Sequence, residues 1–143
     1  MEAGPETKQI FLSYSGEDEC EAGLLQFALE TLLASNAIHV WTYKRDQLAS
    51  TRSIKEQVRR STALIFIASP NTVKGGATQW MELGYADAFN IQTYVLLHRI
   101  TYAKLKMKER GAAPFLTEGQ CSPLSSWRQI ADELLIYLNQ NQK

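Results

Sequence analysis

The chain has 143 residues, in which 15 Lys and Arg residues balance 15 Asp and Glu residues. A chain of this length builds a single core, so we expect one domain. A formal net charge of zero offers no general attraction for nucleic acid or an anionic membrane, and neither partner is expected.

Cysteine and histidine usage gives no sign of a metal centre. Cys20 and Cys121 lack the paired spacing of a zinc site or a disulfide framework, and His39 and His98 lie in or beside apolar runs. No apolar run has the length of a signal peptide or a membrane span. We therefore expect a cytoplasmic protein without metal or resident cofactor, with a disordered leader at 1–7 and one domain at 8–140.

The first half of the chain alternates short apolar runs with helical patterns. The predicted elements are a strand at 9–14, a helix from an S-x-x-D capping turn at 15–18 to about 36, a strand at 39–43, a polar loop at 44–51, and a helix from the capping box at 53–56 to about 61. Two strand-to-helix units therefore open the chain.

The second half continues the alternation. Residues 63–68 (ALIFIA) are apolar without alternation, which is typical of a central strand covered on both faces. The other predicted elements are a loop containing Gly75-Gly76, a helix capped by Thr78, a strand at 93–97, an edge strand at 113–116, and a helix that starts at Ser122-Pro123 and carries an apolar stripe from Trp127 to Leu138. We interpret the basic cluster Lys104, Lys106, Lys108 and Arg110 as a solvated loop or short helix rather than a binding patch.

This alternation predicts an α/β fold with a flavodoxin-like, mainly parallel sheet of five strands in the order 2-1-3-4-5 and helices on both faces. In such sheets ligands bind beyond the carboxyl ends of the strands, where the strand order reverses. The loop at 13–18 should then face the loop at 69–78 and Glu82, with the loop after the second strand alongside.

Glu82 is the carboxylate best placed for chemistry in this arrangement. An acidic residue near the start of a helix can simply complement the helix dipole, or it can be catalytic. Glu82 shares a helical face with Tyr85, Ala86 and Phe89, so we expect it to border packed surface.

Other kinds of site are poorly supported. The sequence contains neither G-x-G-x-x-G nor G-x-x-x-x-G-K-[ST], which excludes the usual dinucleotide and triphosphate cradles. Neither histidine belongs to a motif that would activate a Ser or Cys nucleophile. A single acid, Glu82, remains, with four aromatic residues expected nearby: Tyr14, Trp41, Tyr43 and Trp80. Taken singly, each aromatic residue is more often a core residue than a ligand contact.

Four segments together resemble a Toll/interleukin-1 receptor (TIR) domain over about residues 8–139. They are the opening box at 10–18 (IFLSYSGED), the turn at 68–71 (ASPN), the helix that carries Trp80 and Glu82-Leu83, and the last helix at 127–138. The resemblance is to the NAD+-consuming, bacterial-type branch of the family.

Many TIR domains hydrolyse or cyclise NAD+ with a Glu on the third helix, and by position that residue is Glu82. The resemblance implies that NAD+ is the substrate rather than a cofactor. It also implies that Tyr14 and Trp41 border the nicotinamide and the ribose. Ser13, Tyr43 and Trp80 are further expected substrate contacts. The loop at 44–53 would be a mobile lid that serves self-association with other TIR domains. A sensor domain in a longer immune or antiphage protein is expected.

Two features depart from the family pattern, and two alternatives stay open. Trp80 lies two residues before Glu82, whereas family members commonly have a Trp four residues before, and residues 48–52 (LASTR) lack the frequent Pro-Gly pair. A non-catalytic TIR adaptor is one alternative. The other is an enzyme like the nucleoside 2-deoxyribosyltransferases, which residues 78–88 also resemble.

Overall fold

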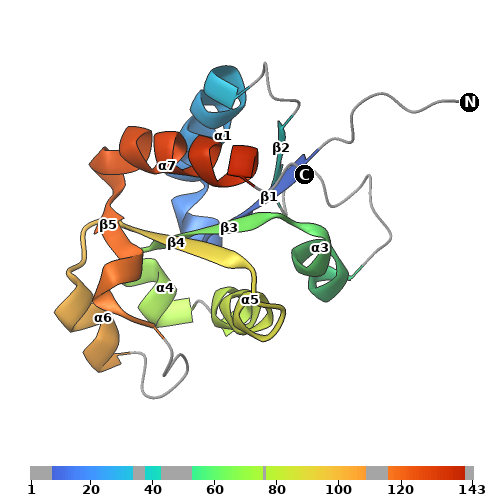
Figure 1. Ribbon diagram of the computed structural model, residues 1–143. Helices are drawn as coiled ribbons and strands as arrows, with labels where there is room; N and C mark the ends of the chain where they lie inside the picture. The colour runs from blue at the N-terminus through green and yellow to red at the C-terminus, as the bar shows by residue number, and fades with distance from the viewer. Residues whose placement is uncertain (1–7, 34–37, 43–52, 76, 109–115, 141–143) are drawn as a thin grey trace, which may run out of the picture.

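The computed structural model describes residues 8–33, 38–42, 53–75, 77–108 and 116–140 (Figure 1). The strands are β1 (Lys8–Ser13), β2 (Ile38–Thr42), β3 (Ala63–Ala68), β4 (Gln92–Leu97) and β5 (Cys121–Pro123). The helices are α1 (Glu19–Leu33), α3 (Ile54–Arg60), α4 (Pro70–Gly75), α5 (Ala77–Ala88), α6 (Tyr102–Lys108) and α7 (Trp127–Gln140).

The five strands form one sheet in the order β2-β1-β3-β4-β5. Every neighbouring pair is parallel. In Figure 1, α1 and α7 lie on one face of the sheet, and α3 and α5 lie on the other. The predicted flavodoxin-like α/β fold, its strand order and its two helical layers are confirmed.

Each face of the sheet has its own apolar core. One core joins the sheet to α1 and α7 through residues such as Leu29 and Leu134, and the other joins it to α3 and α5 through Val58 and Leu83. All six residues of β3 are buried, as expected for a central strand with helices above and below. β1 and β3 are paired in parallel, so their carboxyl ends lie side by side.

Several local predictions are confirmed. β3 occupies the residues predicted for it. The Ser53 hydroxyl caps α3 by accepting a hydrogen bond from the Glu56 amide at 3.2 Å. The basic cluster forms a short helix, α6, as far as its residues are described.

Three predicted helix starts were wrong. Ser15 makes no capping hydrogen bond, and a 3-10 turn at Gly16–Asp18 precedes α1. Thr78 lies inside α5, which begins at Ala77, so Glu82 falls in the second turn of the helix rather than the first. The last helix begins at Trp127, after a 3-10 turn at Leu124–Ser126.

Two short elements of the structure also differ from the sequence-based prediction. The loop predicted after β3 contains the helix α4, whose start is favoured by Pro70 and by the Ser69 hydroxyl, which accepts from the Asn71 amide at 3.0 Å. The fifth strand is Cys121–Pro123 instead of 113–116, of which 113–115 lie outside the described residues. Three residues are too few to show an alternating pattern, and β5 is held by pairing with β4.

Candidate functional site

The candidate site is built around Glu82, which α5 places beside the carboxyl end of β1. The side chain is buried, with 4% of its surface exposed. Its Oε1 accepts a hydrogen bond of 2.6 Å from the hydroxyl of Ser13, the last residue of β1. A strand end and a helix turn 69 residues apart in the sequence therefore fix one carboxylate.

Burial makes this carboxyl group a weaker acid than an exposed Glu. Removal from water disfavours the charged form and raises the pKa of Glu82 from 4.5 to about 7, although the hydrogen bond from Ser13 lowers it. Near neutral pH the group is divided between its acid and its carboxylate. A group with its pKa near the working pH is suited to proton transfer or to charge stabilisation.

One turn before Glu82, the buried amide of Gln79 ties α5 to the strand ends. Its Nε2 donates to the carbonyl of Ile67 at 2.6 Å and to the carbonyl of Ser13 at 3.3 Å. Its Oε1 accepts from the Thr72 hydroxyl at 2.7 Å. The position of Glu82 thus depends on the ends of both β1 and β3.

A second polar cluster joins the turns that follow these two strands. Asp18 is buried. It accepts hydrogen bonds from the Ser69 hydroxyl at 2.5 Å and from the side-chain amide of Asn71 at 2.8 Å. These bonds hold the segment after β1 against the segment after β3, as the predicted strand order requires.

A hollow of about 580 Å³ opens next to Glu82. The turn after β1, Ile54 of α3, and Gly75, Thr78 and Met81 around the start of α5 border it. Its size is within the range of about 300–1,000 Å³ typical of small-molecule sites. Glu19 contributes a second carboxylate, and no Lys or Arg is among the described residues that line it.

The structure brings Ser13, Tyr14 and Glu82 together. Ser13 contacts the Glu82 carboxylate, while Tyr14 is half-buried and borders the hollow. Trp80 lies elsewhere: its ring packs on Phe66, with 5.5 Å between ring centroids, and it does not line the hollow. Side chains two positions apart on a helix do not share a face, which accounts for the different directions of Trp80 and Glu82.

The remaining predicted contacts are only partly described. The backbone of Trp41 lies in β2, paired in register with Phe11 of β1, but its side chain is outside the described part of the structure. Tyr43 and the predicted lid up to residue 52 also lie outside the described residues.

Sequence reasoning missed Gln79, Thr72 and the pairing role of Asp18. Gln79 could have been found, since it precedes Glu82 by three residues and so shares its helical face. Thr72 gave no signal, because the segment that contains it was predicted to be a loop. Within the described residues, no group of three or more His, Cys, Asp or Glu side chains could hold a metal ion.

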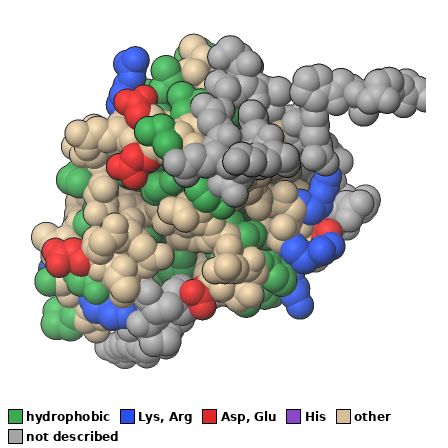
Figure 2. Space-filling view, in the orientation of Figure 1, with side chains coloured by type: hydrophobic (Ala, Val, Ile, Leu, Met, Phe, Trp, Pro, Cys, Tyr) green, Lys and Arg blue, Asp and Glu red, His purple; other side chains and the backbone are tan. Residues whose placement is uncertain are grey.

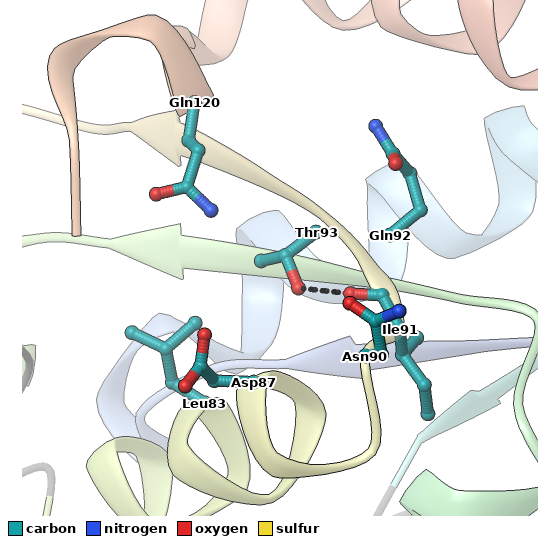
Figure 3. Close-up of a pocket in the computed structure, with 7 residues that line it drawn as sticks. All are labelled: Leu83, Asp87, Asn90, Ile91, Gln92, Thr93 and Gln120. Carbon is teal, nitrogen blue, oxygen red and sulfur yellow. Dashed lines mark hydrogen bonds between the residues drawn. The ribbon is translucent and has the colours of Figure 1, made fainter. Parts of the chain in front are cut away.

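A different hollow, of about 320 Å³, lies at the other end of the sheet (Figure 3). It is bordered by the later turns of α5, the start of β4 and Gln120, whose side chain points into the space between these elements in Figure 3. The Thr93 hydroxyl donates to the Ile91 carbonyl at 3.0 Å. Among the described residues that line this hollow, the acidic one is Asp87, which is exposed, so none of them is a buried carboxylate like Glu82.

No protein-family model matches the chain, and no curated protein matches it. Among solved structures, the TIR domains of the activated Roq1 resistosome, which directly recognises the pathogen effector XopQ, are similar with a TM-score of 0.52 and 16% identity over 74% of this chain and 66% of that one. A 2-desoxiribosyltransferase from Leishmania mexicana is similar with a TM-score of 0.48 and 15% identity over 63% of this chain and 64% of that one.

The similarity to the TIR domains supports a TIR-like fold. The chain spans slightly less than two thirds of each neighbour's length, 66% and 64%. At 16% identity the similarity to the TIR domains concerns the fold alone. No helix within the described residues is both long enough and apolar enough to cross a bilayer.

Proposed function

We propose that the chain is a TIR-type NAD+ glycohydrolase or cyclase with Glu82 as its catalytic residue. The observation that carries the proposal is a buried carboxylate, with its pKa raised to about 7, at the edge of a hollow of about 580 Å³. The hollow lies beyond the carboxyl end of β1, where ligands bind in sheets of this topology.

The reaction breaks the bond between C1′ of the ribose and the nicotinamide nitrogen. The bonding electron pair leaves with nicotinamide, which becomes a neutral ring and needs no strong acid. Positive charge develops on the ribose, and ionised Glu82 stabilises it in a site of low dielectric. Attack on C1′ by water gives ADP-ribose and releases one proton, whereas attack by a nitrogen of the adenine gives a cyclic product.

The surrounding residues suit this role. The Ser13 hydroxyl holds the carboxylate at 2.6 Å and restrains its direction, so little reorganisation is needed during the reaction. Tyr14 and Ile54 border the same hollow and offer apolar surface to the nicotinamide ring. In this proposal, Ser13 positions the Glu82 carboxylate and Tyr14 contacts the substrate.

Assembly forms part of the proposal. The similar TIR domains belong to a resistosome. We infer that this chain likewise associates with other copies in the cytoplasm, as the immune or antiphage effector module of a longer protein with a sensor domain. Its activity then depends on that association.

The test is nicotinamide release from NAD+ by concentrated protein, followed by chromatography. Glu82→Gln should lower the rate by at least about 100-fold, since it removes the charge that acts on the transition state. Asp87→Asn is the matched control, because Asp87 is an exposed carboxylate on the same helix, and it should leave the rate unchanged.

Other outcomes would contradict the proposal. A rate retained in Glu82→Gln would exclude Glu82 as the catalytic residue. Base exchange on a deoxynucleoside without NAD+ cleavage would identify a 2-deoxyribosyltransferase. Self-association without turnover, even in crowded solution, would identify a non-catalytic adaptor.

A further inference from the structure

A basic hollow of about 240 Å³ lies between α4 and α6. Lys74, Arg99, Lys104 and Lys108 border it, together with the apolar side chains of Val73 and Ile100. No Asp or Glu is among the described residues that line it. Figure 2 shows basic side chains at the lower left, in the region of α6 in Figure 1.

These four positive charges are not neutralised by the described part of the chain, in which none of them forms an ion pair with a carboxylate. An adjoining hollow that shares Arg99 is bordered by three acidic residues, Glu17, Asp18 and Glu21, of which Glu17 is exposed to solvent. Asp18 there is already engaged by Ser69 and Asn71, and Glu21 lies 3.7 Å from His98. A local excess of four cations in a chain of zero net charge favours a bound anion.

Ordered elements present these charges. Lys104 and Lys108 are four residues apart and share one face of α6, which the fully buried Leu105 anchors in the core. Arg99 has a left-handed backbone with φ of 62° and follows His98, whose amide donates to the Ala68 carbonyl at 2.7 Å. Ordered elements therefore set the backbone positions of the four basic residues, and their side chains are exposed at the hollow.

We propose that this hollow binds a small ligand that carries two or more adjacent phosphates, of the diphosphate class. Several cations around one concavity match the clustered charge of a diphosphate, and the Arg99 guanidinium can bind phosphate oxygens in a bidentate manner. Val73 and Ile100 can contact the organic part of such a ligand. A nucleic acid or membrane partner would require an extended basic surface rather than a local hollow.

This site is separate from the proposed NAD+ site, since the two hollows share no lining residue. It reinterprets the basic cluster of the sequence: Lys104 and Lys108 belong to a binding site completed by α4 and by Arg99. Arg110 lies outside the described residues.

The experiment is calorimetric titration of the full chain with inorganic pyrophosphate. We expect one site per chain, with affinity that falls as salt is added, and weakening of about three- to tenfold in Arg99→Asn and in Lys104→Gln. Asn is chosen at position 99 because it tolerates the left-handed backbone found there. Lys106→Gln is the matched control on the same helix, since Lys106 does not border the hollow.

Circular dichroism and thermal unfolding of each variant check that it is folded. Equal weakening by Lys106→Gln would overturn the proposal, as would pyrophosphate binding retained in the triple variant Lys74→Gln, Arg99→Asn, Lys104→Gln. Binding lost in Glu82→Gln but kept in the triple variant would place pyrophosphate in the other hollow and also overturn it. Binding to vesicles that contain anionic phospholipid, without binding to pyrophosphate, would identify a membrane surface instead.

Discussion

At the scale of single residues, burial and hydrogen bonding act on Glu82 in opposite directions. Burial raises its pKa to about 7, and the Ser13 hydroxyl lowers it, because that hydrogen bond is stronger to the carboxylate than to the acid. The proposed reaction uses the ionised form. The protonation state of this one group therefore links the structure to a measurable pH dependence.

The first prediction concerns the pH profile of nicotinamide release. The rate should rise with pH and reach half its maximum near pH 7, as Glu82 ionises. Ser13→Ala removes the contact that lowers the pKa, so its midpoint should move to higher pH. Initial rates across the pH range test both points, and a midpoint that is unmoved or lower in Ser13→Ala would contradict the assignment of Ser13.

The second prediction concerns stability. The folded state raises the pKa of Glu82 from 4.5 to about 7. The stability that the protein gains from protonated Glu82 is therefore fully present below pH 4.5 and is lost as pH rises through 7. At 1.36 kcal/mol per pKa unit, the charged group costs about 3 kcal/mol above that range. Glu82→Gln avoids this cost, so the variant should be the more stable protein at pH 8.

Urea unfolding at pH 8 and at pH 4.5 measures the difference. The free energies of unfolding of wild type and Glu82→Gln should converge at the lower pH. A variant less stable than wild type at pH 8 would mean that burial costs the carboxylate little. The expected combination of lost activity and gained stability is characteristic of a residue kept for function.

At the scale of elements, α5 is positioned by the hydrogen bonds of Gln79 to two strand ends. Gln79→Ala removes three buried hydrogen bonds, to the Ile67 carbonyl, the Ser13 carbonyl and the Thr72 hydroxyl. It should lower the free energy of unfolding by about 1–3 kcal/mol and also reduce activity, since Glu82 shares the helix. Gln129→Ala, at an exposed position of α7, is the matched control and should change neither quantity in urea unfolding and rate measurements.

The long elements could be predicted from the sequence because their signals are local. β3 is a continuous apolar run, and α3 begins with a capping box whose hydrogen bond forms. α4 was missed because residues 69–78 were interpreted as a loop, although Ser69-Pro70 starts a helix. β5 exists through pairing with β4, which its three residues do not encode.

The candidate site was likewise predictable from the sequence only in part. Strand order alone predicted that Ser13, Tyr14 and Glu82 would converge, because the topology fixes which strand ends meet. The supporting contacts could not be predicted, since Gln79 binds backbone carbonyls, which every residue possesses. The direction of Trp80 depends on its helical phase relative to Glu82 rather than on its distance in the sequence.

At the scale of the whole molecule, charge is distributed unevenly around the two hollows. The hollow at Glu82 has carboxylates at positions 19 and 82, and no Lys or Arg is among the described residues that line it. A dinucleotide carries two negative charges on its diphosphate, which this lining leaves without counter-charge. Under the proposed function, we expect the counter-charge to come from residues outside the described ranges or from a neighbouring copy.

The last prediction separates these two sources. If a neighbouring copy completes the site, the rate of nicotinamide release per chain should rise with protein concentration, together with the mass measured by light scattering. If the same chain supplies the cation, the rate per chain should stay constant on dilution. Basic residues at 44, 45 and 52 lie outside the described ranges, so replacing all three with Gln tests the second case directly. A concentration-independent rate that this triple variant abolishes would show that one chain holds the complete site, and would contradict activation by assembly.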